Sequence, residues 1–280
     1  MSTLNQPSRV SAWLSALIAS FIFCVLVGIG SALLQSLFSG YGATGVRPQV
    51  TLRLTGSVAG QVSAVFLVIL YLRSQNRSLA DIGFGRSSST YGWIAAAVLT
   101  ALFVWLMLTG PLRGRAALAE LSFFHLYNSV IAGLGAGFCE ELVFRGFLMS
   151  VLSWAGIGRV TQVLASGLLF GLAHVGWTTL GAAFDPRLFL GTVISTAVLG
   201  MAYAGIYLIG GRSLTPVIAS HTITDVIIEP WPLSQEHCIN SKRAWAHRCL
   251  QSRHLTVRST RTPRRRRSRV VRSAPVSLVR

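Results

Sequence analysis

The hydrophobic residues of this 280-residue chain gather in long uncharged runs that are separated by short segments carrying arginines. A helix needs about 20 apolar residues to cross the hydrocarbon core of a bilayer. Because backbone groups in lipid must be satisfied within the segment, and no apolar-polar alternation indicates barrel strands, each run is predicted to be a helix. The runs cover residues 10–46, 54–72, 87–112, 121–139, 160–184, 188–211 and, shorter, 213–224.

Residues 121–158 form an apolar region that only the stretch EELVFR interrupts. As a helix it would extend about 57 Å at 1.5 Å per residue, nearly two hydrocarbon thicknesses. We therefore do not expect one straight helix. Either a span is followed by an interfacial helix, or two spans meet near Trp154 and Gly156. The predicted fold class is all-α, a polytopic transmembrane bundle of about seven or eight helices.

Composition divides the chain into a membrane domain and a basic tail. A hydrophobic share of 52% with 12% charged residues is typical of a bilayer protein. Of the 25 Lys and Arg, 13 lie between residues 231 and 280, so most of the net charge of +17 belongs to the tail. We predict a transmembrane domain over 1–231 and a disordered basic tail over 232–280, either solvated or held on anionic lipid.

The same division bears on partners and location. Without its tail the protein is only mildly basic, so we expect no specific nucleic-acid binding. The lipid bilayer is the expected partner, and the expected location is a membrane crossed several times, the plasma membrane if the source is bacterial. The sequence leaves the oligomeric state open.

Besides His125, which we interpret as a packed residue, six ionisable residues lie in the apolar segments. Each costs a few kcal/mol at membrane depth, so each indicates a function by default. They are Glu140, Glu141 and Arg145 in GFCEELVFRG, His174 in GLLFGLAHVGW, and His221 and Asp225 in IASHTITDVI.

The spacing of these residues separates a pair from the rest. Glu141 and Arg145 are four apart, in the favoured order for an ion pair on one helical face. Glu140 projects about 100° away from Glu141, with nothing nearby in sequence to neutralise it. His221 and Asp225 repeat the spacing of four. We expect these groups to face one another across the bundle.

Two chemistries fit such a cluster. Two histidines and a glutamate are the ligands of many catalytic zinc ions, which makes Glu140, His174 and His221 a candidate Zn²⁺ set. Without a metal, Glu140 can act as a general base on water while the imidazoles or Asp225 polarise a carbonyl. A lone histidine in an apolar helix is, however, more often a packed residue than a ligand. A proton relay in a transporter would also collect such residues.

Three motifs in order then resemble a known family. EELVFRG, FGLAH and HTITD look like the EExxxR, FxxxH and HxxxN/D signatures of the CPBP intramembrane proteases, which include CAAX prenyl endopeptidases and the Abi bacteriocin-immunity proteins. SLADIGFGR, residues 78–86, resembles a short segment that often precedes the catalytic helices in that family. The resemblance covers about residues 70–231.

The resemblance implies a role for each of the six residues. Glu140 would activate the attacking water, with Glu141 and Arg145 in support. His174 would help to hold that water or a metal. His221 would position the scissile carbonyl or its oxyanion together with Asp225, which stands where many members have asparagine.

The leading hypothesis is therefore an intramembrane endopeptidase, with or without zinc, that cleaves a membrane-associated protein or peptide such as a prenylated CAAX substrate. A non-catalytic immunity or chaperone-like membrane protein that keeps the polar network for structure is the first alternative. A proton-coupled transporter is the second. Whichever of these functions holds, the GxxxG spacing of Gly133 and Gly137 would let a neighbouring helix approach just before Glu140.

Overall fold

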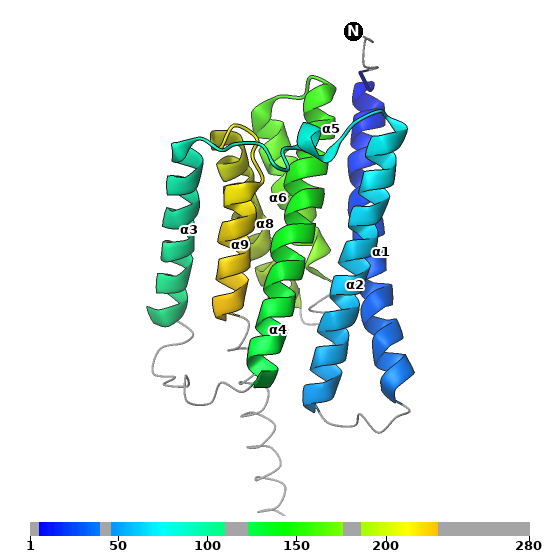
Figure 1. The fold of residues 1–280 in the computed structure, drawn as a ribbon, viewed down its shortest axis with the longest axis vertical. Helices are drawn as coiled ribbons and strands as arrows, with labels where there is room; N and C mark the ends of the chain where they lie inside the picture. Colours follow the sequence, from blue (N-terminus) through cyan, green and yellow to red (C-terminus); the bar gives the residue numbers. More distant parts are fainter. Residues whose placement is uncertain (1–5, 40–45, 110–122, 176–185, 229–280) are drawn as a thin grey trace, which may run out of the picture. The chain divides into compact units, whose positions relative to one another are not determined.

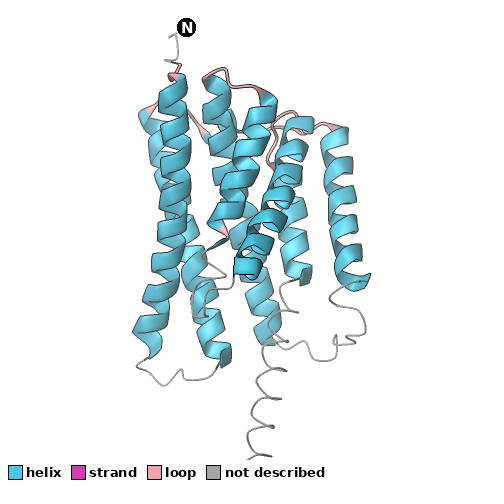
Figure 2. Cartoon of the chain, turned by 180° about the vertical axis from the view of Figure 1, so that it is seen from behind, coloured by secondary structure: helices cyan, strands magenta, loops and turns pink. Residues whose placement is uncertain are grey.

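A computed structural model of the chain describes residues 6–39, 46–109, 123–175 and 186–228 (Figure 1). These residues form seven helices and no strand, which confirms the all-α helix bundle. Figure 2 shows the described helices from behind, joined at one end by short loops. The predicted basic tail, 232–280, lies outside the described residues.

The helices follow the predicted apolar runs. They are α1 (Arg9–Ser39), α2 (Val46–Ser74), α3 (Thr90–Thr109), one long helix made of α4 (Phe123–Leu134), η3 (Gly135–Glu140), η4 (Leu142–Leu148) and α5 (Met149–Trp154), then α6 (Arg159–Ala173), α8 (Pro186–Ile209) and α9 (Thr215–Ile228). A short 3₁₀ turn, η1 (Leu79–Ile82), lies between α2 and α3.

The long helix runs without a break from residue 123 to residue 154. Of the two arrangements predicted for this region, the structure has the second, because the chain turns at Gly156 (φ 69°) and α6 begins at Arg159. Instead of a break, the helix widens into the π-helical segments η3 and η4, in which the hydrogen bonds span five residues. The EELVFR motif lies in this widened part.

Many large apolar side chains of the bundle point outward. Three helices are long and apolar enough to cross a membrane, over Arg9–Phe38, Thr51–Ser74 and Phe189–Ile209, and shorter apolar helices cover Thr90–Leu106 and Arg159–Ala173. Phe21 and Phe66, for example, are 69% and 58% exposed. Such outward apolar faces are suited to lipid rather than to water.

Glycines let the helices approach closely. A Cβ atom on Gly30 of α1 would overlap the backbone of Gly56 on α2, and the reverse holds as well. The predicted GxxxG contact is confirmed, since a Cβ on Gly133 would meet Val226 and one on Gly137 would meet Thr222, both on α9. Small residues thus bring the long helix and α9 together one turn before the glutamates.

Residues 78–86 are held against the turn between α8 and α9. The backbone N–H of Leu214 donates to the carbonyl of Gly83 (3.1 Å), and the hydroxyl of Tyr207 donates to the carbonyl of Ile82 (3.0 Å). Asp81 closes this segment by accepting from the backbone N–H of Ser78 at 2.6 Å. The segment therefore helps to fix where α9 begins.

We predict that Gly137→Ala lowers the stability of the bundle. Its Cβ would lie 2.7 Å from the backbone nitrogen of Thr222, so α9 must shift. Overpacking of this kind costs about 1–3 kcal/mol. The matched control is Gly205→Ala in α8, where the Cβ meets nothing within 4 Å. Thermal unfolding in detergent should show a lower Tm for Gly137→Ala alone; equal Tm values for the two variants would contradict the close contact.

A second prediction concerns pH. The backbone hydrogen bond from Ser78 holds the pKa of Asp81 below its ordinary value, and the hydroxyl of Ser78 and the charges of Arg77 and Arg86 act in the same direction. A lowered folded pKa stabilises the protein above the unfolded pKa of about 3.9, and this stabilisation disappears as pH falls through the folded value. The wild type should have a higher Tm than Asp81→Asn at pH 7. The difference should vanish in acid, and a constant difference would refute this assignment.

Candidate functional site

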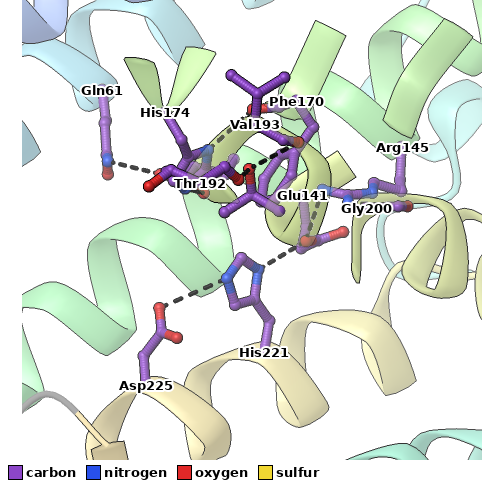
Figure 3. Close-up of polar contacts among 12 residues, drawn as sticks. Gln61, Glu141, Arg145, Phe170, His174, Thr192, Val193, Gly200, His221 and Asp225 are labelled. Atoms are coloured by element: carbon purple, nitrogen blue, oxygen red, sulfur yellow. Dashed lines mark hydrogen bonds and ion pairs between the residues drawn. The ribbon is translucent and has the colours of Figure 1, made fainter. Parts of the chain in front are cut away.

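The six ionisable residues predicted from the sequence lie close together where three helices meet. Figure 3 labels all of them except Glu140. The long helix supplies the two glutamates and Arg145, the C-terminal end of α6 supplies His174, and α9 supplies His221 and Asp225.

Glu140 has one hydrogen-bonded and one unpaired carboxylate oxygen. Its Oε1 accepts a hydrogen bond from Nε2 of Gln61 on α2 (3.1 Å). Its Oε2 has no hydrogen-bond partner among the described residues and lies 3.8 Å from Nε2 of His174. Since 3.8 Å is too long for a direct hydrogen bond, this buried oxygen is unpaired in the part of the chain that the structure describes. Glu140 itself is only 3% exposed.

Glu141 and Arg145 form a fully buried ion pair. Nη1 of Arg145 donates to Oε1 of Glu141 at 2.8 Å, and Nη2 donates to the carbonyl of Gly200 on α8 at 3.1 Å. The guanidinium also lies over the ring of Phe170, 4.2 Å from its centroid. The predicted ion pair is therefore present. Through Arg145 it also connects the long helix to α6 and α8.

His221 lies between two carboxylates. Its Nδ1 is 2.6 Å from Oε1 of Glu141, and its Nε2 is 3.4 Å from Oδ2 of Asp225 (Figure 3). Its ring stacks on Tyr203 of α8, with centroids 4.8 Å apart. Three contacts thus determine the orientation of this imidazole.

His174 has its tautomer set by the backbone. Its Nδ1 lies 2.8 Å from the carbonyl oxygen of Phe170, which can only accept, so Nδ1 carries the hydrogen. In neutral His174, Nε2 is then a hydrogen-bond acceptor that faces Glu140. The side chains of His174 and Asp225 are 22% and 24% exposed, whereas Glu141 is sealed, so the cluster is open to its surroundings on one side only.

The sequence interpretation missed three contributors: Gln61, Tyr203 and the carbonyl of Gly200. Gln61 had a usable signal, because it is the only amide side chain in the apolar run 54–72. Tyr203 had a weaker one, as tyrosines are common at membrane interfaces. A backbone carbonyl leaves no trace in a sequence.

The candidate zinc ligands do not form a three-ligand centre in this arrangement. Glu140 and His174 approach each other closely enough to share an ion, but both ring nitrogens of His221 contact other carboxylates. Among the described residues, no three His, Cys, Asp or Glu side chains form a group that could hold a metal. The donor set therefore does not fit a zinc site, and the steps below use the protein's own groups.

Comparison with known proteins bears on the part of the chain that carries this cluster. Residues 121–227 match the model of the family described as Type II CAAX prenyl endopeptidase Rce1-like. No curated protein and no solved structure matches the chain. The matched segment contains all six predicted residues, while Gln61 lies outside it. The resemblance seen in the three motifs is thus confirmed: residues 121–227, the Rce1-like segment, are similar to this family, which is consistent with the CPBP family, and the chain is a helical membrane protein.

Proposed function

We propose that the chain is a multi-pass intramembrane endopeptidase that hydrolyses a peptide bond of a membrane-associated protein with a water activated by Glu140. The observation that carries this proposal is the unpaired, buried Oε2 of Glu140, which lies 3.8 Å from Nε2 of His174. The Rce1-like match supports the reaction class.

The first step is the attack of water on the peptide carbonyl. A water held between Glu140 and His174 donates one hydrogen to each acceptor, which leaves an oxygen lone pair for the carbonyl carbon. Glu140 takes the proton as the new carbon–oxygen bond forms, and the carbonyl π electrons move to its oxygen. The site is poor in competing water, so each fixed charge acts strongly on this step.

The second step is the collapse of the tetrahedral intermediate. Nδ1 of His221 stays on Glu141, and its Nε2–H would leave the long 3.4 Å contact with Asp225 to donate to the oxyanion. Glu140 then returns its proton to the leaving nitrogen, the carbon–nitrogen bond breaks, and an amine and a carboxylic acid are released. Arg145 takes no proton in this sequence; it holds the carboxylate of Glu141 in place.

The substrate that fits this site is a protein with a lipid anchor near its C-terminus, such as a prenylated CAAX protein. An apolar cavity of about 290 Å³ supports this choice; it is lined by residues of α1, α2 and η4. Three of its lining residues, Ala64, Val68 and Tyr71, are three, seven and ten positions after Gln61, so they continue the same face of α2. The cavity has the apolar lining that a hydrocarbon chain requires, although none of the six site residues lines it.

We expect Glu140→Gln to lose cleavage by about 10²–10⁴-fold, since the amide cannot accept the proton from water. The substitution is isosteric, so Tm should change little. The assay is cleavage of a fluorogenic farnesylated CAAX peptide in liposomes. His174→Ala and His221→Ala should also lose activity. Asp81→Asn, which changes an acid outside the cluster, is the control and should cleave normally.

Other outcomes of this experiment favour the alternatives. If all three site variants cleave as the wild type does, the enzymatic assignment of these residues is wrong. If the wild type folds but cleaves nothing and the variants lose stability, the polar network is structural, as in a non-catalytic immunity or chaperone-like protein. Proton-driven solute uptake into vesicles would identify a transporter.

Because the donor set does not form a three-ligand centre, we predict that cleavage survives treatment with 1,10-phenanthroline or EDTA. Elemental analysis of the purified protein should find far less than one zinc per chain. A stoichiometry near one, with activity lost on chelation and restored by Zn²⁺, would show instead that His221 rearranges to join Glu140 and His174 around a metal.

A further inference from the structure

Gln61 is the one described side chain that donates a hydrogen bond to Glu140. It lies on α2, 79 residues away in sequence and outside the Rce1-like segment. Both residues are 3% exposed, so bulk water does not compete for the contact. The amide nitrogen lies 3.1 Å from Oε1 of Glu140.

We propose that Gln61 is a positioning residue for the reaction, which holds the carboxylate of Glu140 by Oε1 so that Oε2 faces His174 and the attacking water. This inference rests on the proposed function. Without the bond, the glutamate side chain can rotate about its last torsion, which is broad and prefers no single orientation. The bond selects the orientation in which the unpaired Oε2 points to Nε2 of His174.

The other polar groups near Glu140 have partners of their own. Arg145 donates to Glu141 and to the carbonyl of Gly200, and His221 lies between Glu141 and Asp225. His174 is 3.8 Å away, beyond hydrogen-bond distance. Gln61 on α2 is therefore the group that orients the carboxylate of Glu140. Because its amide is neutral, it does not neutralise the carboxylate as an arginine or lysine would. An oriented carboxylate that keeps its charge is what a general base requires.

The packing around Gln61 indicates that its place is fixed. The long helix has Gly135 opposite this part of α2, and a Cβ there would lie 3.1 Å from Oε1 of Gln61 and closer still to Val58. Glycine therefore leaves the space that the amide and its neighbour occupy. Five residues before Gln61, the contact of Gly56 with Gly30 holds α2 tightly against α1.

The test compares Gln61→Met with Gln162→Met in liposomes, using the fluorogenic farnesylated CAAX peptide. Methionine has nearly the shape of glutamine but cannot donate. For Gln61→Met we expect kcat to fall by about 10–100-fold, since a misplaced catalytic group costs up to about 10²-fold, while KM and Tm stay close to wild type. Gln162 is also a buried helical glutamine, but it bonds the carbonyl of Ile157 and Arg212. Gln162→Met should keep its kcat, whatever its Tm.

Gln61→Asn keeps the amide but is one methylene shorter, and it should lose kcat in the same way. The inference is overturned if Gln61→Met and Gln61→Asn cleave at the wild-type rate, or if kcat falls only in step with Tm and KM, as a purely structural contact would require. Either result leaves the assignment of Glu140 as the general base intact, provided that Glu140→Gln is inactive. A folded wild type that cleaves nothing overturns the proposed function itself, which is a different observation.

Discussion

The rest of the site depends on the contacts of the buried Glu141 carboxylate with Arg145 and His221. One oxygen of this group receives both Arg145 and His221, so a single atom joins the long helix to α9, while Arg145 extends the link to α8. Removing one partner of a fully buried ion pair costs about 3–5 kcal/mol, because the other charge is left unpaired. The orientation of His221 and the stability of the bundle therefore have the same origin.

Close helix contact is the second requirement. The side chains of Glu141 and His221 can meet only if the backbones of the long helix and α9 approach closely, and Gly133 and Gly137 allow this approach just before the charges. In lipid there is little hydrophobic force between helices, so such packing and the polar bonds together hold them. The glycines and the ion pairs thus depend on each other.

Sequence reasoning could predict the helices and the six ionisable residues, because a charged side chain in an apolar run stands out without any knowledge of the fold. It could also predict the contact at Gly137 from its spacing. It could not predict that Gln61 reaches Glu140, since this pairing depends on how α2 packs against a helix far along the chain. It also missed the π-helical turns, because the hydrogen-bond shift in η3 and η4 has no signature in the residue pattern.

Those π-helical turns have a consequence for how the motif tolerates changes in length. A wide turn holds more residues than an ordinary one, so a deletion within η4 could be absorbed by a return to α-helical geometry, and the chain beyond it would stay in place. A deletion at 142–144 would, however, shorten the spacing of Glu141 and Arg145 from four residues to three and change the geometry of their ion pair. In this part of the chain, the length of the peptide is therefore constrained by side-chain chemistry rather than by the helix itself.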